Sequence, residues 1–141
     1  MVININNFFN SRNKNSKIAH FQDLDHLNGV SIATTSANLY GTKRDDLVLF
    51  YFRNRANYAS VYTQSKIVSE NIKWNSKIKS KKIRAIMINT RNANAFTGKD
   101  GFEGLKILAQ DLSEILTEKQ KIDEERPEKI KPNEILFACT G

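Results

Sequence analysis

This sequence is poor in the residues that build several common kinds of site and scaffold. Its 141 residues contain one cysteine, Cys139, which excludes an internal disulfide framework and a zinc site made of several cysteines. The two histidines, His20 and His26, are six residues apart and do not share a helical face as an i, i+4 pair of zinc ligands does. We therefore expect no metal site, solvated or packing histidines, and a buried, inert thiol.

Long apolar runs are also missing. The longest uncharged ones, 47–52 and 135–139, are far shorter than the roughly 20 residues that cross a bilayer, so we expect no membrane-spanning segment. The six glycines form neither a Walker loop nor a dinucleotide fingerprint, and their spacing at 98, 101 and 104 is typical of a turn that enters a helix. The length, with 40% hydrophobic and 26% charged residues, fits one globular domain.

Positive charge is present, but it is local. The net charge is +7; residues 51–100 contain eleven Lys/Arg against two Asp/Glu, whereas residues 101–141 contain six against nine. This excess could bind phosphates, with Tyr58 and Tyr62 as stacking platforms, and a nucleic-acid-binding module is one interpretation. We favour a solvated, lysine-rich connector, because blocks of like charge usually lie on the surface. The basic segment comprises Lys66, Lys73, Lys77, Lys79, Lys81, Lys82 and Arg84.

The N-terminal residues 1–25 differ from the rest in composition. They are rich in Asn, Ser and Lys and have no acidic residue before Asp23. A mitochondrial transit peptide is one interpretation, but the segment lacks a clear amphipathic stripe. We favour an irregular N-terminal extension over 1–25, followed by a structured domain over 26–141.

Short apolar or β-branched runs predict several strands. Residues 47–53 and 83–88 are nearly all apolar, which is typical of strands covered on both faces. The alternating segment 58–63 predicts another strand, with 54–57 turning the chain back as a hairpin. Further strands are expected over 29–36 and 135–138.

One amphipathic helix is expected with the strands. Apolar residues recur at three- and four-residue steps after Asp100, and the pair Asp100 and Glu103 has the spacing of a capping box. Residues 65–82 are expected to be a polar connector, helical at its start if at all, and 121–133 a solvated loop. Strands before and after the helix predict the fold class α/β (α+β).

The most informative stretch is the loop 89–98, which we name the Asn loop. Asn89, Asn92 and Asn94 lie within six residues, directly after an apolar strand. Asparagine competes for backbone hydrogen bonds and tolerates left-handed conformations, so the pattern predicts a structured strand-end loop or a simple turn. Sites are often built on loops at strand ends.

This loop resembles the signature Asn-Ser-Gly-Asn-Ala-Asn-Ala-Cys-Thr-Gly of the glutamate N-acetyltransferase/ornithine acetyltransferase family of arginine biosynthesis. Segments 29–49 and 59–66 are similar to the family's opening strands and its Ala-Gly-Val-Phe-Thr-Thr-Asn block. Residues 137–141, Phe-Ala-Cys-Thr-Gly, resemble its Ser-Thr-Gly motif, with Cys139 at the Ser position. The order and spacing of the four blocks agree from about residue 26 to residue 141.

The resemblance implies the N-terminal part of an αββα sandwich of the self-cleaving N-terminal-Thr type. A freed Thr takes the acetyl group from N-acetylornithine, or in some members from acetyl-CoA, and passes it to glutamate. Thr140 and Gly141 match the motif that forms the oxyanion hole, and Asn89, Asn92 and Asn94 are candidates for supporting the site. The expected partner is the β-subunit from the same precursor, in a heterotetramer, in the cytoplasm or, in a fungus or similar eukaryote, the mitochondrial matrix. No cofactor is expected.

The departures from the family pattern are Arg91, where a Gly is usual, and Phe96, where a Cys or other small residue is common. The cleavage site, the nucleophile and the substrate-binding residues lie further along in the family, so no nucleophile is named in this chain. We expect a truncated piece that is inactive and marginally folded by itself. The alternatives are a basic nucleic-acid-binding module using 66–84, and a degenerate relative with only a structural role.

Overall fold

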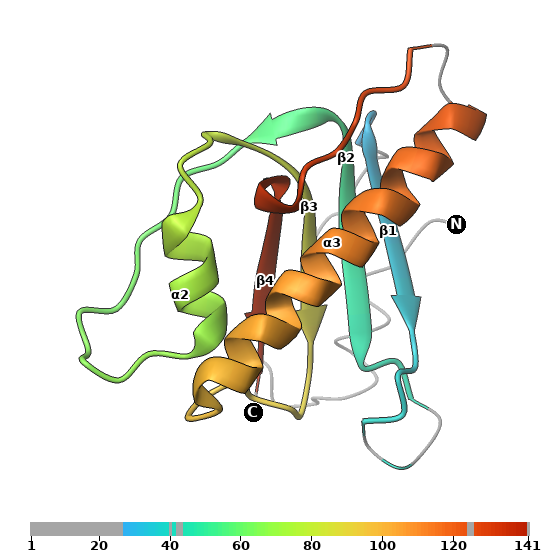
Figure 1. Ribbon diagram of the computed structural model, residues 1–141. Helices are drawn as coiled ribbons and strands as arrows, with labels where there is room; N and C mark the ends of the chain where they lie inside the picture. Colours follow the sequence, from blue (N-terminus) through green and yellow to red (C-terminus); the bar gives the residue numbers. More distant parts are fainter. Residues whose placement is uncertain (1–26, 40, 42–43, 124–125, 141) are drawn as a thin grey trace, which may run out of the picture.

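The computed structural model describes residues 27–39, 41, 44–123 and 126–140. The expected extension 1–25, both histidines and Gly141 lie outside this part of the chain. The described residues form the strands β1 (Val30–Thr35), β2 (Leu47–Asn57), β3 (Lys82–Asn89) and β4 (Ile135–Cys139), the helices α2 (Glu70–Lys77) and α3 (Gly98–Asp123), and the 3-10 turn η1 (Pro132–Glu134) (Figure 1).

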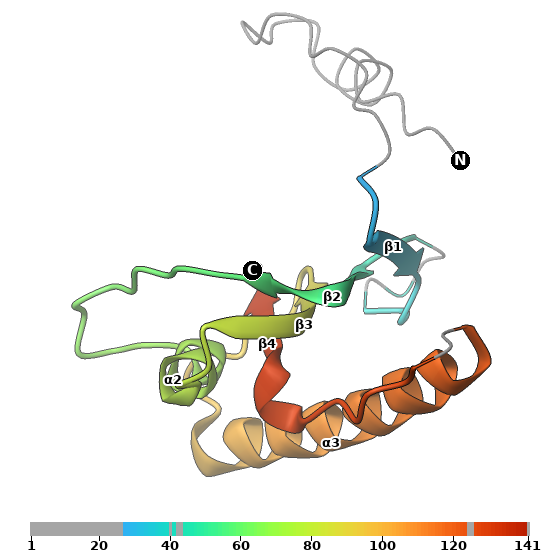
Figure 2. The ribbon, with the colours of Figure 1, turned by 90° about the horizontal axis from the view of Figure 1, so that it is seen from above.

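The four strands form one sheet in the order β1-β2-β3-β4. The pairs β1/β2 and β2/β3 are antiparallel, and β3 and β4 are parallel. The long helix α3 connects the two parallel strands and lies across one face of the sheet, while α2 lies beside β4 (Figures 1 and 2). The predicted mixed α/β class is confirmed.

The core forms where the apolar stripe of α3 meets β3 and β4. Ala85 of β3 and Ile135 of β4 are opposite each other in the register and are both 0% exposed. Full burial of an aliphatic or aromatic side chain is worth about 1.5–3 kcal/mol, so this layer accounts for much of the stability of the fold. The core cluster consists of Ala85, Leu105, Ala109, Leu116, Ile130, Ile135 and Phe137.

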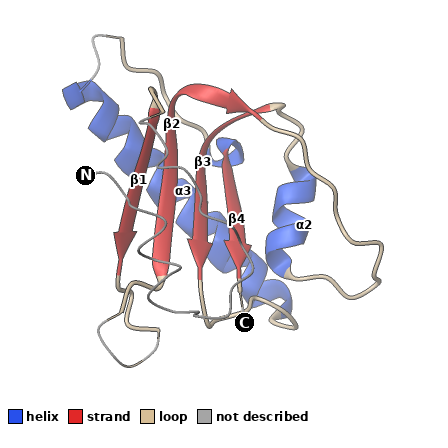
Figure 3. Cartoon of the chain, turned by 180° about the vertical axis from the view of Figure 1, so that it is seen from behind, coloured by secondary structure: helices blue, strands red, loops and turns tan. Residues whose placement is uncertain are grey.

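The opposite face of the sheet is also apolar, and no described helix covers it (Figure 3). Val48 of β2 pairs with Ile88 of β3, and Phe50 pairs with Ile86, so these side chains share a face. All four are half-buried. A sheet that is apolar on both faces is typical of a layer that lies between two others.

Two predictions about β2 and the segment after it are wrong. The expected turn over 54–57 belongs to β2, which continues through Asn57. The expected strand over 58–63 is extended chain without a partner strand in the described structure. A strand requires a neighbour to pair with, and the alternating pattern does not reveal whether one is present.

The predicted helices need smaller corrections. The helix α3 begins at Gly98, so Asp100 lies inside its first turn and does not cap it, and the capping box with Glu103 is wrong. Its end at Asp123 takes in residues that we expected to be loop. The helix α2 lies in the middle of the expected connector 65–82, not at its start.

Arg84 closes an irregularity between β2 and β3. Tyr51 pairs with Ala85 but Ala56 pairs with Ile83, so residues 52–55 bulge opposite Arg84 alone. The Arg84 guanidinium donates to the carbonyls of Phe52 and Arg53 inside the bulge. Its side chain is 3% exposed, so these backbone acceptors replace water.

Glu128 joins Arg84 to the chain that follows α3. Its carboxylate accepts from Arg84 Nη2 at 2.6 Å and pairs with Arg55, which also donates to Glu134 at 2.6 Å. The positive charge of Arg55, with a further contribution from Arg84, lowers the pKa of Glu128. Because a lowered pKa keeps a carboxylate ionised down to more acidic pH, the ion pairs of Glu128 weaken as the pH falls through that lowered value.

Candidate active-site edge

The candidate site lies at one edge of the sheet, where β3 and β4 end. These strands are parallel, so their carboxyl ends meet, and Asn89 is opposite Cys139. The next residue, Thr140, donates its backbone N–H to Asn89 O at 3.0 Å. The structure thereby brings the Asn loop and Thr140 together, as the resemblance implies (Figure 1).

Asn94 connects this edge to the rest of the fold. Its side-chain Nδ2 donates to Asn71 Oδ1 at 3.0 Å and to Gly101 O at 3.3 Å, and its Oδ1 accepts from the Thr97 hydroxyl. Its backbone N–H donates to Cys139 Sγ at 3.3 Å. One residue of the loop thus contacts α2, the start of α3 and the end of β4.

The helix α2 contributes two residues that the sequence did not single out. Asn71 is 4% exposed and Glu70 is 3% exposed. The backbone N–H of Glu70 donates to Asn94 O at 2.9 Å, and its carboxylate pairs with Lys73 at 2.6 Å. Burial of a polar side chain costs free energy unless it is hydrogen-bonded, so the Asn71 contact with Asn94 fixes the loop relative to α2.

The other two asparagines are hydrogen-bonded to each other. Asn89 donates its Nδ2 to Asn92 O at 2.9 Å, which closes the first half of the loop. Asn92 is exposed, and it contributes this backbone carbonyl. Of the three predicted supporting residues, Asn94 contacts α2, α3 and Cys139, and Asn89 contacts Thr140.

The geometry limits what Thr140 can offer a ligand. Its backbone N–H is engaged by Asn89 O, so it does not point at a neighbouring molecule. Within the described part of the chain its hydroxyl makes no hydrogen bond, and the residue is exposed at the end of β4. The predicted partner in the oxyanion motif, Gly141, lies outside the described residues.

Asp46 supports the same edge from the other side. It is 1% exposed and accepts from Ala37 N at 2.6 Å and from Leu39 N at 2.7 Å, which orders the turn between β1 and β2. Its own carbonyl accepts from Thr90 N at 2.9 Å, at the start of the Asn loop. A carboxylate that follows directly after a charged turn was the available sequence signal, but its burial was not predictable.

The basic segment does not act as one surface. Arg84 is buried in the bulge of β2, Lys73 pairs with Glu70, and Lys77 lies 4.1 Å from the centre of the Phe102 ring. The lysines at 66, 79, 81 and 82 remain exposed. Only part of the segment is therefore available to a phosphate backbone, and the expectation of a fully solvated connector is wrong for Arg84 and for α2.

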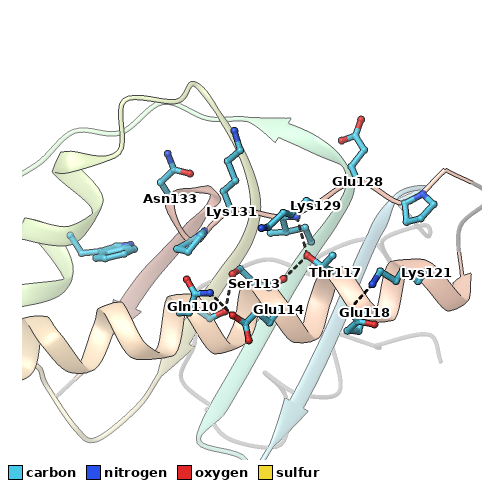
Figure 4. A pocket seen from close by; sticks show the side chains of 14 residues that line it. Gln110, Ser113, Glu114, Thr117, Glu118, Lys121, Glu128, Lys129, Lys131 and Asn133 are labelled. Carbon is cyan, nitrogen blue, oxygen red and sulfur yellow. Dashed lines mark hydrogen bonds and ion pairs between the residues drawn. The ribbon is translucent and has the colours of Figure 1, made fainter.

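A groove of about 1080 Å³ lies elsewhere, between α3 and residues 127–133, with Trp74 among its lining (Figure 4). None of the residues of the candidate edge lines it. Thr117 donates to Ser113 O at 2.6 Å and accepts from Ile130 N at 3.0 Å, so the groove follows the seam that ties this segment to α3.

Metal ligands and membrane helices are absent from the described ranges. No three His, Cys, Asp or Glu residues of the described part gather as a metal site would require. Neither described helix is long and apolar enough to span a bilayer.

Comparison with known proteins identifies relatives of this chain. The model of the ArgJ family matches residues 31–141. The arginine biosynthesis bifunctional protein ArgJ of Bradyrhizobium diazoefficiens is 36% identical over 89 residues, which are 62% of this chain and 22% of that protein. The protein of the same name from Bartonella henselae is 32% identical over 123 residues, 86% of this chain and 27% of that protein. The chain thus spans about a quarter of the length of these curated relatives.

Solved structures show the same fold. Ornithine acetyltransferase from Mycobacterium tuberculosis, complexed with ornithine, superimposes with a TM-score of 0.70 at 21% identity, covering 81% of this chain and 56% of that chain. The ArgJ protein of Bacillus halodurans gives a TM-score of 0.60 at 22% identity, over 81% of this chain and 54% of that chain. The fold expected from the resemblance is confirmed.

The two departures from the resembled signature are both in strained backbone. Arg91 has φ of 67° and Phe96 has φ of 60°, in the left-handed region that favours glycine. At position 91 the signature has Gly, the residue that adopts a positive φ without a steric penalty. The contacts of Asn94 hold the loop in this conformation despite the strain.

The contact between Asn94 and α3 predicts different effects at two nearby glycines. A β-carbon on Gly101 would collide with the side-chain oxygens of Thr97 and Asn94, whereas one on Gly104 would meet nothing within 4 Å. We expect Gly101→Ala to destabilise the fold by roughly 1–3 kcal/mol, as overpacking does. The matched control Gly104→Ala should stabilise it by about 0.5–1 kcal/mol, because Ala is the better helix former. Urea titration of the two variants measures both, and equal effects would contradict this account of Gly101.

The strain at Arg91 predicts the order of two substitutions. Arg91→Gly removes the left-handed penalty of roughly 1–2 kcal/mol, part of which is offset by the greater freedom of Gly in the unfolded chain. Arg91→Ala keeps the penalty and also removes the side chain. We therefore expect the Gly variant to be more stable than the Ala variant by about 1 kcal/mol in chemical denaturation. An Ala variant that is at least as stable would show that the backbone is not strained.

Proposed function

This chain belongs to the ArgJ family, and from that premise we propose that it takes part in transferring an acetyl group in arginine biosynthesis. The donor is N-acetylornithine and the acceptor is glutamate, with an acetyl-threonine enzyme between the two half-reactions. The observation that carries the proposal is the edge where the Asn loop meets Thr140, at the position of the family's Thr-Gly motif. The names of the relatives, arginine biosynthesis bifunctional protein and ornithine acetyltransferase, support the same activity.

The part that we assign to this chain is the oxyanion hole. When a nucleophile attacks the acetyl carbonyl, negative charge develops on the oxygen, and fixed hydrogen-bond donors stabilise it. The backbone N–H of Thr140 already donates to Asn89 O, so the donor from this residue is its hydroxyl. The backbone N–H of Gly141 is the second donor in this proposal.

The Asn loop positions the donors. Asn89 holds the Thr140 amide, and Asn94 holds the preceding residue through Cys139 Sγ. One contact is made to the Thr140 backbone and the other to the side chain of the residue before it, so we expect the direction of the Thr140 side chain to depend on both. Donors that are fixed before the reaction need no reorganisation in the transition state, which is the source of their effect.

The nucleophile comes from the part of the family proteins that this chain does not span. The relatives are about four times as long as the matched segment, since the match covers 22–27% of them. The face of the sheet that contains Phe50, Ile86 and Ile88 is apolar and has no described helix on it (Figure 3). A second sheet packed on this face would form the inner layers of an αββα sandwich and bring the nucleophile to the edge.

The test uses a chimera of the Bartonella henselae relative in which this chain replaces the segment that it matches. We expect the chimera to release ornithine from N-acetylornithine in the presence of glutamate. Thr140→Val should lower kcat by about 10²–10³-fold, because it removes one oxyanion donor. The control Thr140→Ser keeps the hydroxyl and should stay within about tenfold of the parent.

Two outcomes would contradict the proposal. One is a folded, self-cleaved chimera that transfers no acetyl group. The other is a Val variant as active as the Ser variant, which would remove the hydroxyl from the oxyanion hole.

A further inference from the structure

Residues 59–69, which we name the arm, leave the sheet after β2 and return at α2. Figures 1 and 2 show the arm as a wide excursion beside α2, away from the sheet. Residues 59–67 are all exposed. Unstructured surface loops are usually short, so an extended excursion of this length needs a reason.

Both ends of the arm are fixed to the body of the fold. Tyr58 donates its backbone N–H to Lys81 O at 3.1 Å and its hydroxyl to Ile78 O at 3.3 Å. Glu70 is held at the other end by Asn94 O. Between these anchors, within the described structure, no hydrogen bond joins residues 59–64 to another segment. Residues 59–64 of the arm are therefore a tethered stretch whose backbone makes no hydrogen bond to another segment of the described structure.

The side chains of the arm are those of a strand. Val61 is 98% exposed and Ile67 is 63% exposed, whereas Tyr62 is 36% exposed. Valine, tyrosine and threonine are enriched in strands, and this composition is why the sequence predicts one here. The sequence favours a strand, and what is missing is its neighbour.

The charge around the arm indicates the charge of the strand that would pair with it. The sequence has no Asp or Glu from residue 47 to residue 69. Lys66 lies in the arm, and the exposed Lys79 and Lys81 flank the anchor at Tyr58. A partner strand with acidic side chains complements this surface, whereas a second copy of the arm would bring like charges together.

We propose that residues 59–63 pair with an acidic edge strand from the part of the ArgJ proteins that this chain does not span. This inference rests on the proposed function, because that function requires the remainder of the protein as the partner. Pairing supplies the main-chain hydrogen bonds that the arm lacks and buries Val61, as in other cases of strand addition. The arm then holds the two parts together next to α2, whose residues Glu70 and Asn71 fix the Asn loop.

The test coexpresses this chain with the remainder of the Bartonella henselae relative, the part beyond the segment that matches, so that the two parts fold together as a complex. Hydrogen exchange of the peptide spanning 59–63 is measured in the free chain and in the complex. We expect rapid exchange in the free chain and at least about tenfold slower exchange in the complex, since strand pairing protects alternate amides.

Proline substitutions test the pairing directly. Ser60→Pro and Val61→Pro each remove one N–H, and these two point to opposite sides of the arm, so one of them faces the partner. The proline variant whose missing N–H faces the partner should bind the remainder at least about tenfold more weakly than the parent, a difference in binding free energy of about 1.4 kcal/mol. The control Val61→Thr keeps both the N–H and the β-branch and should bind within about threefold of the parent. Both prolines should change the melting temperature of the free chain little, because the backbone of Ser60 and Val61 makes no hydrogen bond to another segment there.

Each other outcome has a defined meaning. A complex in which 59–63 exchange as fast as in the free chain overturns the inference, as does the absence of any complex. Protection that grows with the concentration of the free chain would assign the arm to a second copy and also overturn it. Acetyl transfer by a complex without protection would leave the proposed function standing, whereas protection without transfer would remove the function and keep the inference.

Discussion

The side-chain amide of Asn94 is the contact on which the candidate site depends. It joins Asn71 of α2 to the first turn of α3 through Gly101 O, while its backbone holds Cys139 at the end of β4. These elements come from distant parts of the sequence. An amide can do this because it presents two donors and an acceptor in a fixed plane. The position of Thr140 at the sheet edge follows from two contacts. Asn89 O accepts its backbone N–H, and Asn94 holds the preceding Cys139.

A fully bonded polar cluster also explains the strained backbone beside it. Arg91 and Phe96 adopt positive φ values at a cost that only a well-determined loop can offset. The absence of a side chain at Gly101 lets Asn94 and Thr97 approach α3 closely. The same tolerance for strain is typical of sites where groups are held ready for a ligand, and it fits the proposed role in an oxyanion hole.

The parts of the fold that depend on local pattern were predictable. The strands near 47–53, 83–88 and 135–138 follow from continuous apolar runs, and α3 follows from its three- and four-residue periodicity. The Asn loop was singled out by its three asparagines and Thr140 by the resemblance, and the structure places them at one edge.

The parts that depend on distant partners were not predictable. Arg84 resembles a solvated charge in a lysine-rich stretch, but its burial depends on a bulge in β2 and on Glu128, 44 residues further on. Asn71 gains its role from Asn94, 23 residues away. Such contacts between residues far apart in the chain cannot be read from the local sequence pattern.

The most direct test of the central claim is the hydrogen-exchange rate of the Thr140 amide in the Asn94→Ala variant, measured by NMR beside that of a sheet amide such as Ile86. If Asn94 holds this edge, the Thr140 amide will exchange at least about tenfold faster than in the parent chain while the Ile86 amide changes much less, because local opening becomes easier without global unfolding. Equal acceleration at both amides, or no change at Thr140, would show that the position of Thr140 does not depend on Asn94.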